Sequence, residues 1–258
     1  MGSAVASAIL ERILAAGTVE DEQGNALPLH SNISAHKGQR ISACISRYGI
    51  GRTLEVGCAY GISSLYICDA ISKQPNPHHV IIDPAQSTHW HSVGVQNLRR
   101  ARFTFWELIE QPSALALPSL LGRGLKVQFA LIDGFHTFDQ VLLDFFYVDQ
   151  LLEDGGIVAF DDVGMTPINR VVRYVLNYPN YSIVESVNDS ALPKFSLKHR
   201  LFDFCLRRLT NAVPSRVREE YFTASCLRPC ENLRPGINMI LLQKSGPDTR
   251  TWDWYKSF

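Results

Sequence analysis

The sequence predicts an α/β fold: one domain over residues 1–258, built on a doubly wound, mostly parallel seven-stranded sheet with one antiparallel strand. Short apolar runs alternate with helical patterns along most of the chain, which is typical of βα units. Several of these runs end in glycine or acidic residues, as at Gly57, Asp83 and Asp133. At 258 residues and 46% hydrophobic content, the chain is long enough to bury one large core.

Composition and charge exclude several classes of function. The 25 basic and 25 acidic residues balance, so bulk attraction to nucleic acid is not expected. No apolar run reaches the roughly 18 residues of a membrane span, and the first residues lack the basic region of a secretory signal. The six cysteines are scattered, which favours buried thiols over zinc ligands. We therefore expect a cytoplasmic protein.

The first fifty residues, 1–50, are predicted to form a helical cover. Residues 4–15 have the periodicity of an amphipathic helix, which Gly17 ends. A polar, turn-rich segment follows, and a second helix runs to about Tyr48. We expect the first helix to pack on the sheet, with pairing to a second copy of the chain as the alternative, which would make a homodimer.

The stretch 53–64 organises the rest of the chain. It reads as a short apolar strand, a turn bracketed by Gly57 and Gly61, and the start of a helix over 62–71. Glycine takes positive φ freely and lets another molecule approach the backbone. The free N–H groups of the helix N-terminus favour an anionic group at the turn. An ordinary strand–helix turn without a ligand is the alternative.

The next two strands also end in polar residues. The strand over 80–82 ends in Asp83, which lies 26 positions after Gly57 (83 minus 57). A carboxylate near this offset accepts both ribose hydroxyls in βαβ nucleotide sites, although a strand-end turn would also explain it. A third strand is expected over 102–109, and Ser113 lies in the turn after it.

Two acidic strand ends form the second candidate site. A strand over 127–132 ends in Asp133, with His136 three residues later, and a strand over 157–160 ends in Asp161 and Asp162. Between them lies a helix that Gly155 and Gly156 stop. If the two strands are neighbours, their ends lie roughly 5 Å apart. Three converging carboxylates repel one another unless a hard cation such as Mg²⁺ binds them.

These motifs resemble those of class I S-adenosylmethionine (SAM) methyltransferases. The stretch 53–64 is similar to their motif I, and the pattern D-G-x-H…G-G…D-D is similar to that of bacterial small-molecule O-methyltransferases. The Lys-Gly-Gln at 37–39 also resembles catechol O-methyltransferase. The resemblance implies a Rossmann-like fold and a SAM site in which the turn receives the methionine end. The cofactor-binding residues it implies are Ile33, Glu55, Gly57, Tyr60, Gly61, Ser63, Asp83, Ser113 and Asp133.

The same resemblance implies a metal and a base. Magnesium, or another divalent cation, is expected on Asp133, Asp161 and Asp162. His136 has the spacing of a lysine in the catechol enzymes and is the candidate for taking the proton of the attacking hydroxyl. The alternatives are turn carboxylates that bind no metal, and a His136 that caps the next helix or binds the cofactor.

The last part of the chain adds a helix, two strands and an insertion. A helix is predicted over 167–176, and strands are predicted over 181–187 and 237–242. Between these strands lies a basic helical insertion, 188–235, that is expected to act as a lid or dimer helix. A membrane surface or an anionic substrate is the alternative partner for its basic face. The aromatic tail Trp252, Trp254, Tyr255 and Phe258 is expected to pack back on the protein or on a partner.

The function predicted is SAM-dependent O-methylation of a small-molecule hydroxyl, on a sugar, a catechol or another natural product, with the help of Mg²⁺. A metal-independent methyltransferase with His136 as the base is the nearest alternative. A SAM-binding protein without catalysis is a second. A nucleotide-dependent oxidoreductase is a third, which the absence of G-x-G-x-x-G disfavours.

Overall fold

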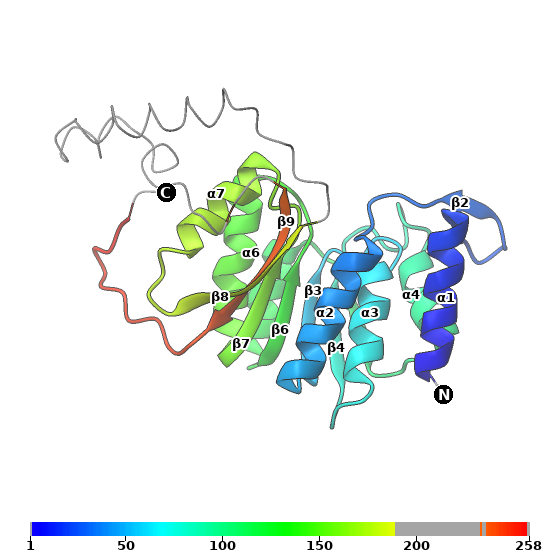
Figure 1. The fold of residues 1–258 in the computed structure, drawn as a ribbon, viewed down its shortest axis with the longest axis horizontal. Helices are drawn as coiled ribbons and strands as arrows, with labels where there is room; N and C mark the ends of the chain where they lie inside the picture. Colours follow the sequence, from blue (N-terminus) through cyan, green and yellow to red (C-terminus); the bar gives the residue numbers. More distant parts are fainter. Residues whose placement is uncertain (1, 189–232, 234–235, 257–258) are drawn as a thin grey trace.

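The computed structural model describes residues 2–188, 233 and 236–256. Its centre is a seven-stranded sheet in the order β5-β4-β3-β6-β7-β9-β8 (Figure 1). The strands are β3 Arg52–Val56, β4 His78–Ile82, β5 Trp106–Ile109, β6 Val127–Ile132, β7 Leu152–Phe160, β8 Tyr181–Asn188 and β9 Ile237–Lys244. β9 runs antiparallel to both of its neighbours, and the other adjacent pairs are parallel. The predicted sheet, with its one antiparallel strand, is confirmed.

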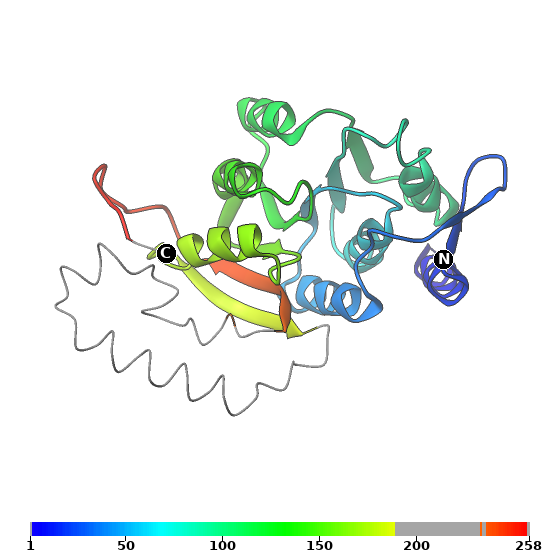
Figure 2. The same cartoon turned by 90° about the horizontal axis from the view of Figure 1, so that it is seen from above.

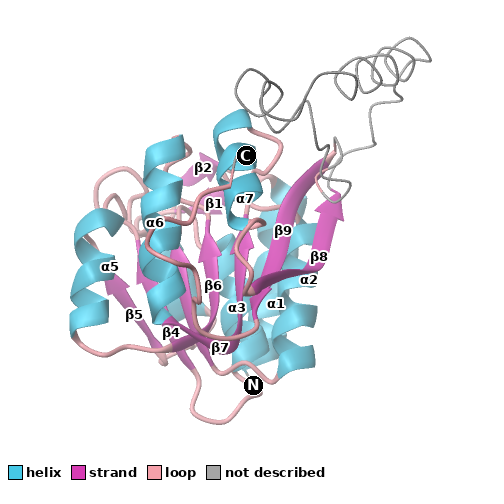
Figure 3. Cartoon of the chain, turned by 90° about the vertical axis from the view of Figure 1, so that its left-hand side faces the viewer, coloured by secondary structure: helices cyan, strands magenta, loops and turns pink. Residues whose placement is uncertain are grey.

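Helices cover both faces of this sheet, as Figure 2 shows. They are α1 Gly2–Ala16, α2 Ala35–Tyr48, α3 Ile62–Ile71, α4 Val93–Arg100, α5 Ser113–Gly122, α6 Phe138–Leu151 and α7 Thr166–Val175. Helices α1 to α4 share one core with the strand residues that point to their side. Helices α5 to α7 share a second core on the opposite face, where α5 and α6 lie in front of the sheet in Figure 3. Strand residues alternate between the two cores, as the pleat requires.

Two strands begin at least four residues away from their predicted starts. β7 begins at Leu152 rather than at residue 157, because the register shifts between Val127 and Phe129 of β6, and Gly155 with φ 83° is accommodated inside the strand. β5 begins at Trp106 rather than at residue 102, because Arg102 takes φ 62° and ends the preceding turn.

The prediction missed two helices and a hairpin. α4 is short, and α5 contains Pro118, which lacks a backbone N–H and hides a helical pattern in the sequence. The strands β1 Thr18–Glu20 and β2 Ala26–Pro28 pair within the segment expected to contain only turns. The ends of α1 and α2 are as expected: Gly17 and Gly49 follow them with positive φ.

Some predictions concern residues outside the described part. The insertion 188–235 is described only at Asn188 and Leu233, so its lid or dimer role stays a prediction. In the tail, Trp254 packs edge-on against two tyrosine rings, whereas Trp252 is 98% exposed and does not pack back. Trp254 thus packs back as expected, packing on a partner stays a prediction, and Phe258 lies outside the described residues. Within the described residues, no helix has the length and apolar character to span a membrane.

Candidate functional site

A cavity of about 570 Å³ opens where β3, β4, β6 and β7 end at their carboxyl ends. Ligands of doubly wound sheets bind at this edge, and the volume lies within the usual range for small-molecule sites. Ten of the twelve predicted site residues line it, including Ile33, Gly57, Tyr60, Ser63, Asp83, Ser113, Asp133, Asp161 and Asp162. His136 also lines it, and Glu55 and Gly61 do not.

The glycines in the turn between β3 and α3 have the positive φ expected of them, and they also allow a close approach of the chain that was not predicted. Gly57 has φ 91°, and a Cβ there would lie 2.1 Å from the backbone oxygen of Asp133. Gly61 has φ 76°, and its Cβ would lie 2.7 Å from the backbone oxygen of Gly94. Both glycines therefore allow close packing of the chain against itself. The N-terminal residues of α3, including Ser63, still border the cavity and can receive an anionic group.

Asp83 holds this turn in place from the end of β4. Its Oδ2 accepts the backbone N–H groups of Cys58 at 3.0 Å and Ala59 at 2.9 Å, and the Gln86 side chain also donates to it. Its Oδ1 accepts one N–H, from Ala85 at 2.9 Å. Asp83 is thus a support of the turn, and Oδ1 is the atom with capacity left for a ribose hydroxyl.

Glu55 lies beneath the turn, away from the cavity. Its side chain is fully buried, where its Oε2 accepts from the Ser64 hydroxyl and faces His79 Nε2 at 3.2 Å. His79 in turn contacts the Thr53 hydroxyl through Nδ1 at 2.9 Å. This buried network links β3, β4 and α3, so the structure gives Glu55 a supporting position and not one at the cavity wall.

Aromatic side chains border the cavity at the turn. The rings of Tyr60 and Trp90 pack edge-to-face with centroids 5.1 Å apart, and both line the cavity. The Tyr60 hydroxyl meets His30 Nε2 at 3.0 Å. Trp90 was not among the predicted site residues, because the loop after β4 carries no motif that marks one of its aromatic residues.

Lys37 belongs to the Lys-Gly-Gln segment noted in the sequence, but the prediction assigned it no role in the site. Its side chain is 4% exposed, and Nζ lies 2.6 Å from Asp161 Oδ1 and 3.6 Å from Asp162 Oδ1. Burial raises the pKa of Asp161, and the ammonium of Lys37 opposes that rise. Lys37 shares the buried face of α2 with Ile41, Cys44 and Ile45, a helical spacing that could have identified it.

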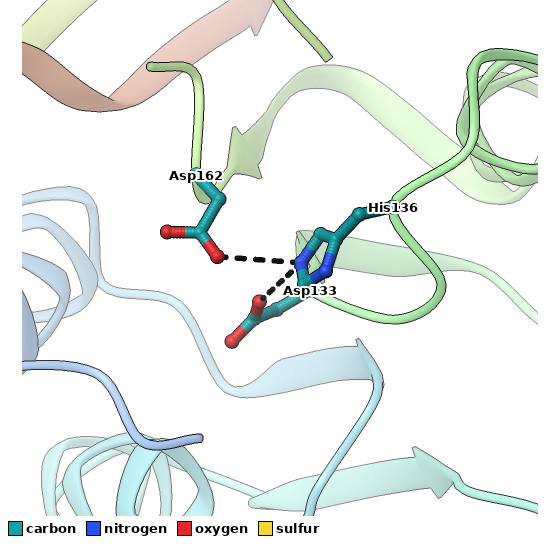
Figure 4. Close-up of side chains that lie close together, drawn as sticks. All are labelled: Asp133, His136 and Asp162. Atoms are coloured by element: carbon teal, nitrogen blue, oxygen red, sulfur yellow. Dashed lines mark ion pairs between the residues drawn. The ribbon is translucent and has the colours of Figure 1, made fainter. Parts of the chain in front are cut away.

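Asp133, His136 and Asp162 form the second group in the cavity (Figure 4). His136 Nε2 lies 3.6 Å from Asp133 Oδ1 and 3.4 Å from Asp162 Oδ2. The three come together because β6 and β7 are paired up to their ends and because Asp162 takes φ 50°, which turns the chain there. Helix α6 has Thr137 as its N-cap, so His136 does not cap it.

The charges in this group act on one another. Burial raises the pKa of Asp133 well above its ordinary value, and the nearby carboxylates add to the rise. The close approach of Asp133 raises the pKa of His136, against the opposing effect of burial. The neighbouring carboxylates therefore favour a positive charge on the imidazole or in the space beside it.

The same group fits a divalent cation. One ligand atom from each of the three residues lies within 4.8 Å of the others, and His136 Nε2 is buried with no hydrogen-bond partner among the described residues. Two carboxylates suit Mg²⁺ or Mn²⁺, and an imidazole nitrogen adds affinity for transition metals. Asp161, which was predicted as a ligand, is instead paired with Lys37.

Comparisons with known proteins bear on the fold and on the kind of domain. Residues 54–163 match the model of a family described as "Methyltransferase domain". No curated protein matches the chain. Among solved structures, the O-methyltransferase TomG from Streptomyces achromogenes, involved in tomaymycin synthesis and solved with SAM, superposes with a TM-score of 0.60 at 13% identity, covering 94% of this chain and 90% of TomG.

Two further solved structures share the fold. The O-methyltransferase from Bacillus cereus, in complex with S-adenosylhomocysteine (SAH), gives a TM-score of 0.58 at 16% identity and covers 73% of this chain and 85% of its own. The SAH-bound methyltransferase PaMTH1 from Podospora anserina gives 0.55 at 15% identity, covering 70% and 82%. Residues 54–163 thus resemble a methyltransferase domain, and the Rossmann-like fold implied by the sequence is confirmed.

Proposed function

We propose that this methyltransferase domain transfers the methyl group of SAM to a hydroxyl group of a small molecule, such as a sugar, a catechol or another natural product. The observation that carries the proposal is a single cavity that combines the N-terminus of α3 with the group Asp133, His136 and Asp162. The O-methyltransferases of similar fold that were solved with SAM or SAH support it.

The cofactor end of the cavity has the donors and acceptors that SAM requires. The N-terminus of α3, with Ser63, offers N–H groups to the methionine carboxylate. Asp83 Oδ1 is the acceptor for a ribose hydroxyl. Ile33 and Tyr60 supply apolar surface that excludes water. SAM, when bound, would supply a methyl group on a positively charged sulfur; as the acceptor oxygen bonds to the methyl carbon, the C–S bond would break and SAH would leave as a neutral thioether.

The acceptor end has a base. His136 Nε2 is directed between two carboxylates and takes the proton that the acceptor hydroxyl loses. Asp133 and Asp162 orient the imidazole and stabilise its protonated form. A divalent cation held by these two carboxylates would polarise the hydroxyl and increase its acidity. In this arrangement His136 acts as the base and not as a ligand.

A metal-independent reaction is the second candidate, and Lys37 is the observation that favours it. Its ammonium already neutralises Asp161 and lies 3.6 Å from Asp162. With Lys37 and a protonated His136, the chain itself supplies two positive charges for its three carboxylates. The two candidates share the cofactor and the acceptor class and differ only in their need for a cation.

Calorimetric titration with SAH, followed by methyl-transfer assays on a panel of hydroxyl compounds, tests the proposal. We expect saturable SAH binding, and turnover that His136→Ala reduces about 100-fold or more. The exposed His36→Ala, on the outer side of α2, is the matched control. Absence of SAH binding would overturn the methyltransferase function. Binding without turnover of any acceptor would favour a SAM-binding protein that is not an enzyme.

The cation is tested separately. Turnover lost in EDTA and restored by Mg²⁺ or Mn²⁺, with Asp133→Asn abolishing the restoration, supports the cation-assisted reaction. Turnover that survives EDTA supports the metal-independent one. NADH binding in place of SAH binding would point to an oxidoreductase instead.

A further inference from the structure

A second polar group lies at the wall of the cavity formed by α5 and α6. Gln140 Nε2 lies 3.0 Å from the Ser113 hydroxyl oxygen and 3.0 Å from Asp144 Oδ1. Ser113 and Gln140 line the cavity, whereas Asp144 is fully buried behind them. The second carboxylate oxygen of Asp144 has no hydrogen-bond partner among the described residues. The function proposed above does not use Gln140 or Asp144.

This geometry determines which end of the Gln140 amide faces the cavity. An ionised carboxylate can only accept hydrogen bonds, so Asp144 requires the NH₂ end of the amide. Burial raises the pKa of Asp144, and the hydrogen bonds from Ser113 and Gln140 oppose that rise. Among the described residues, both hydrogen bonds of Gln140 use its nitrogen. Its carbonyl oxygen is therefore the atom available to a ligand.

The position of this carbonyl oxygen in the cavity determines which part of a bound ligand lies next to it. Ser113 begins α5, directly after β5, and β5 is the neighbour of β4, which carries Asp83. If Asp83 holds the ribose, the base extends towards β5 and α5, away from the N-terminus of α3. A base that meets a fixed acceptor at this wall must present a donor, and the exocyclic amine of adenine is one.

We propose that the Gln140 carbonyl oxygen accepts a hydrogen bond from the 6-amino group of adenine, and that Asp144 is the positioning residue that fixes the orientation of the Gln140 amide. The proposal rests on the proposed use of SAM. According to this proposal, the site distinguishes a purine with an amino group at position 6 from one with an oxo group there. A 6-oxo purine places an acceptor against the Gln140 carbonyl, and Asp144 prevents the amide from rotating to offer its NH₂ group instead.

The test compares SAH with S-inosylhomocysteine, its deaminated analogue, by calorimetric titration of the full chain. We expect the wild-type protein to bind SAH roughly 10- to 100-fold more tightly, because the analogue leaves an acceptor unpaired. Gln140→Met should bring the two affinities within about threefold, mainly by weakening SAH. Gln150→Met, at an amide of the same helix that bonds the Phe146 backbone oxygen, is the matched control and should leave the ratio unchanged.

The variant Asp144→Asn tests the positioning role of Asp144. It also keeps the proposal testable if Gln140→Met does not fold. An asparagine can offer either an acceptor or a donor, so the Gln140 amide can rotate to suit either ligand. We expect the preference for SAH to fall at least fivefold while the affinity for S-inosylhomocysteine rises. A residue that only supported the fold would weaken both ligands equally.

The outcomes separate this inference from the proposed function. Wild-type protein that binds both ligands equally, or a Gln140→Met variant that keeps the full preference for SAH, would overturn the role of Gln140. An Asp144→Asn variant with an unchanged ratio would overturn the positioning role. Failure of the wild type to bind either ligand would overturn the proposed function, and this inference with it.

Discussion

Replacing Lys37 with methionine should destabilise the protein strongly. The change keeps the apolar length of the side chain and removes the ammonium that lies 2.6 Å from Asp161 Oδ1. Both side chains of the pair are 4% exposed, so water cannot replace the lost partner. Breaking a buried pair in this way costs about 3–5 kcal/mol. That is a large part of the roughly 5–15 kcal/mol by which domains are stable.

The stability lost in Lys37→Met should be larger at high pH than at low pH. Burial already raises the pKa of Asp161, and without the ammonium of Lys37 the folded-state pKa rises further. A carboxyl group whose pKa is higher in the folded state destabilises the protein above that pKa and ceases to do so once it is protonated. The difference in free energy of unfolding between wild type and Lys37→Met should thus be largest near pH 8 and shrink as the pH falls.

Urea denaturation at pH 8 and pH 5 measures this difference. Lys73→Met is the control, because the pair of Lys73 with Asp69 leaves the lysine side chain 55% exposed and exposed pairs contribute at most about 1 kcal/mol. Adding Asp161→Asn to Lys37→Met removes the unpaired charge and should restore most of the stability. A loss below about 1 kcal/mol at pH 8, or an effect equal to that of the control, would refute the assignment of a buried ion pair.

Three other predictions concern single positions. The variant His136→Ala should lose turnover but bind SAH with an affinity within about threefold of wild type, because the imidazole is proposed to act on the acceptor. A parallel loss of SAH affinity would contradict that role. Gly57→Ala should cost about 2 kcal/mol or more in thermal unfolding, because its Cβ would collide with backbone at positive φ. Gly124→Ala, with φ 73° in open space, should cost less; equal losses would show that the collision is relieved. The Arg250 side chain lowers the pKa of Asp248, so its stabilisation is present above the ordinary pKa and is lost as pH falls below it. Asp248→Asn should therefore lower the melting temperature at pH 7 and not at pH 2, and a loss that persists at pH 2 would exclude the ion pair as its cause.

Much of the fold follows from local patterns, because each buried strand is a short apolar run that ends in a recognisable turn. Residues such as Asp83 and Asp133 could be placed at the site because parallel strands bring their carboxyl ends to one edge. The strand boundaries failed where neighbouring strands shift register, as at β7. α5 was missed because Pro118 breaks the usual helical signal.

The roles of individual side chains were harder to predict, because they depend on contacts between distant parts of the chain. Glu55 sits in motif I and was assigned to the cofactor, but its partner His79 on the neighbouring strand directs it into a buried network. Gly57 was assigned to ligand approach, and it lines the cavity, but the close approach of the Asp133 backbone oxygen to it was not foreseen. In both cases the residue type was informative, and its partner came from an element that the local sequence does not reveal.

Asp161 and Asp162 show how far two identical neighbours can diverge. Asp161 is buried and faces Lys37 on α2, so it joins the N-terminal cover to the end of β7. Asp162 adopts positive φ, keeps a third of its side chain exposed and faces His136, and its Oδ1 accepts from Asn238 of β9 at 3.3 Å. Because Lys37 neutralises the first carboxylate, the second is available to act together with Asp133. One residue thus separates a buried ion pair from the proposed reactive group, so we expect stability and chemistry to respond to different substitutions at these adjacent positions.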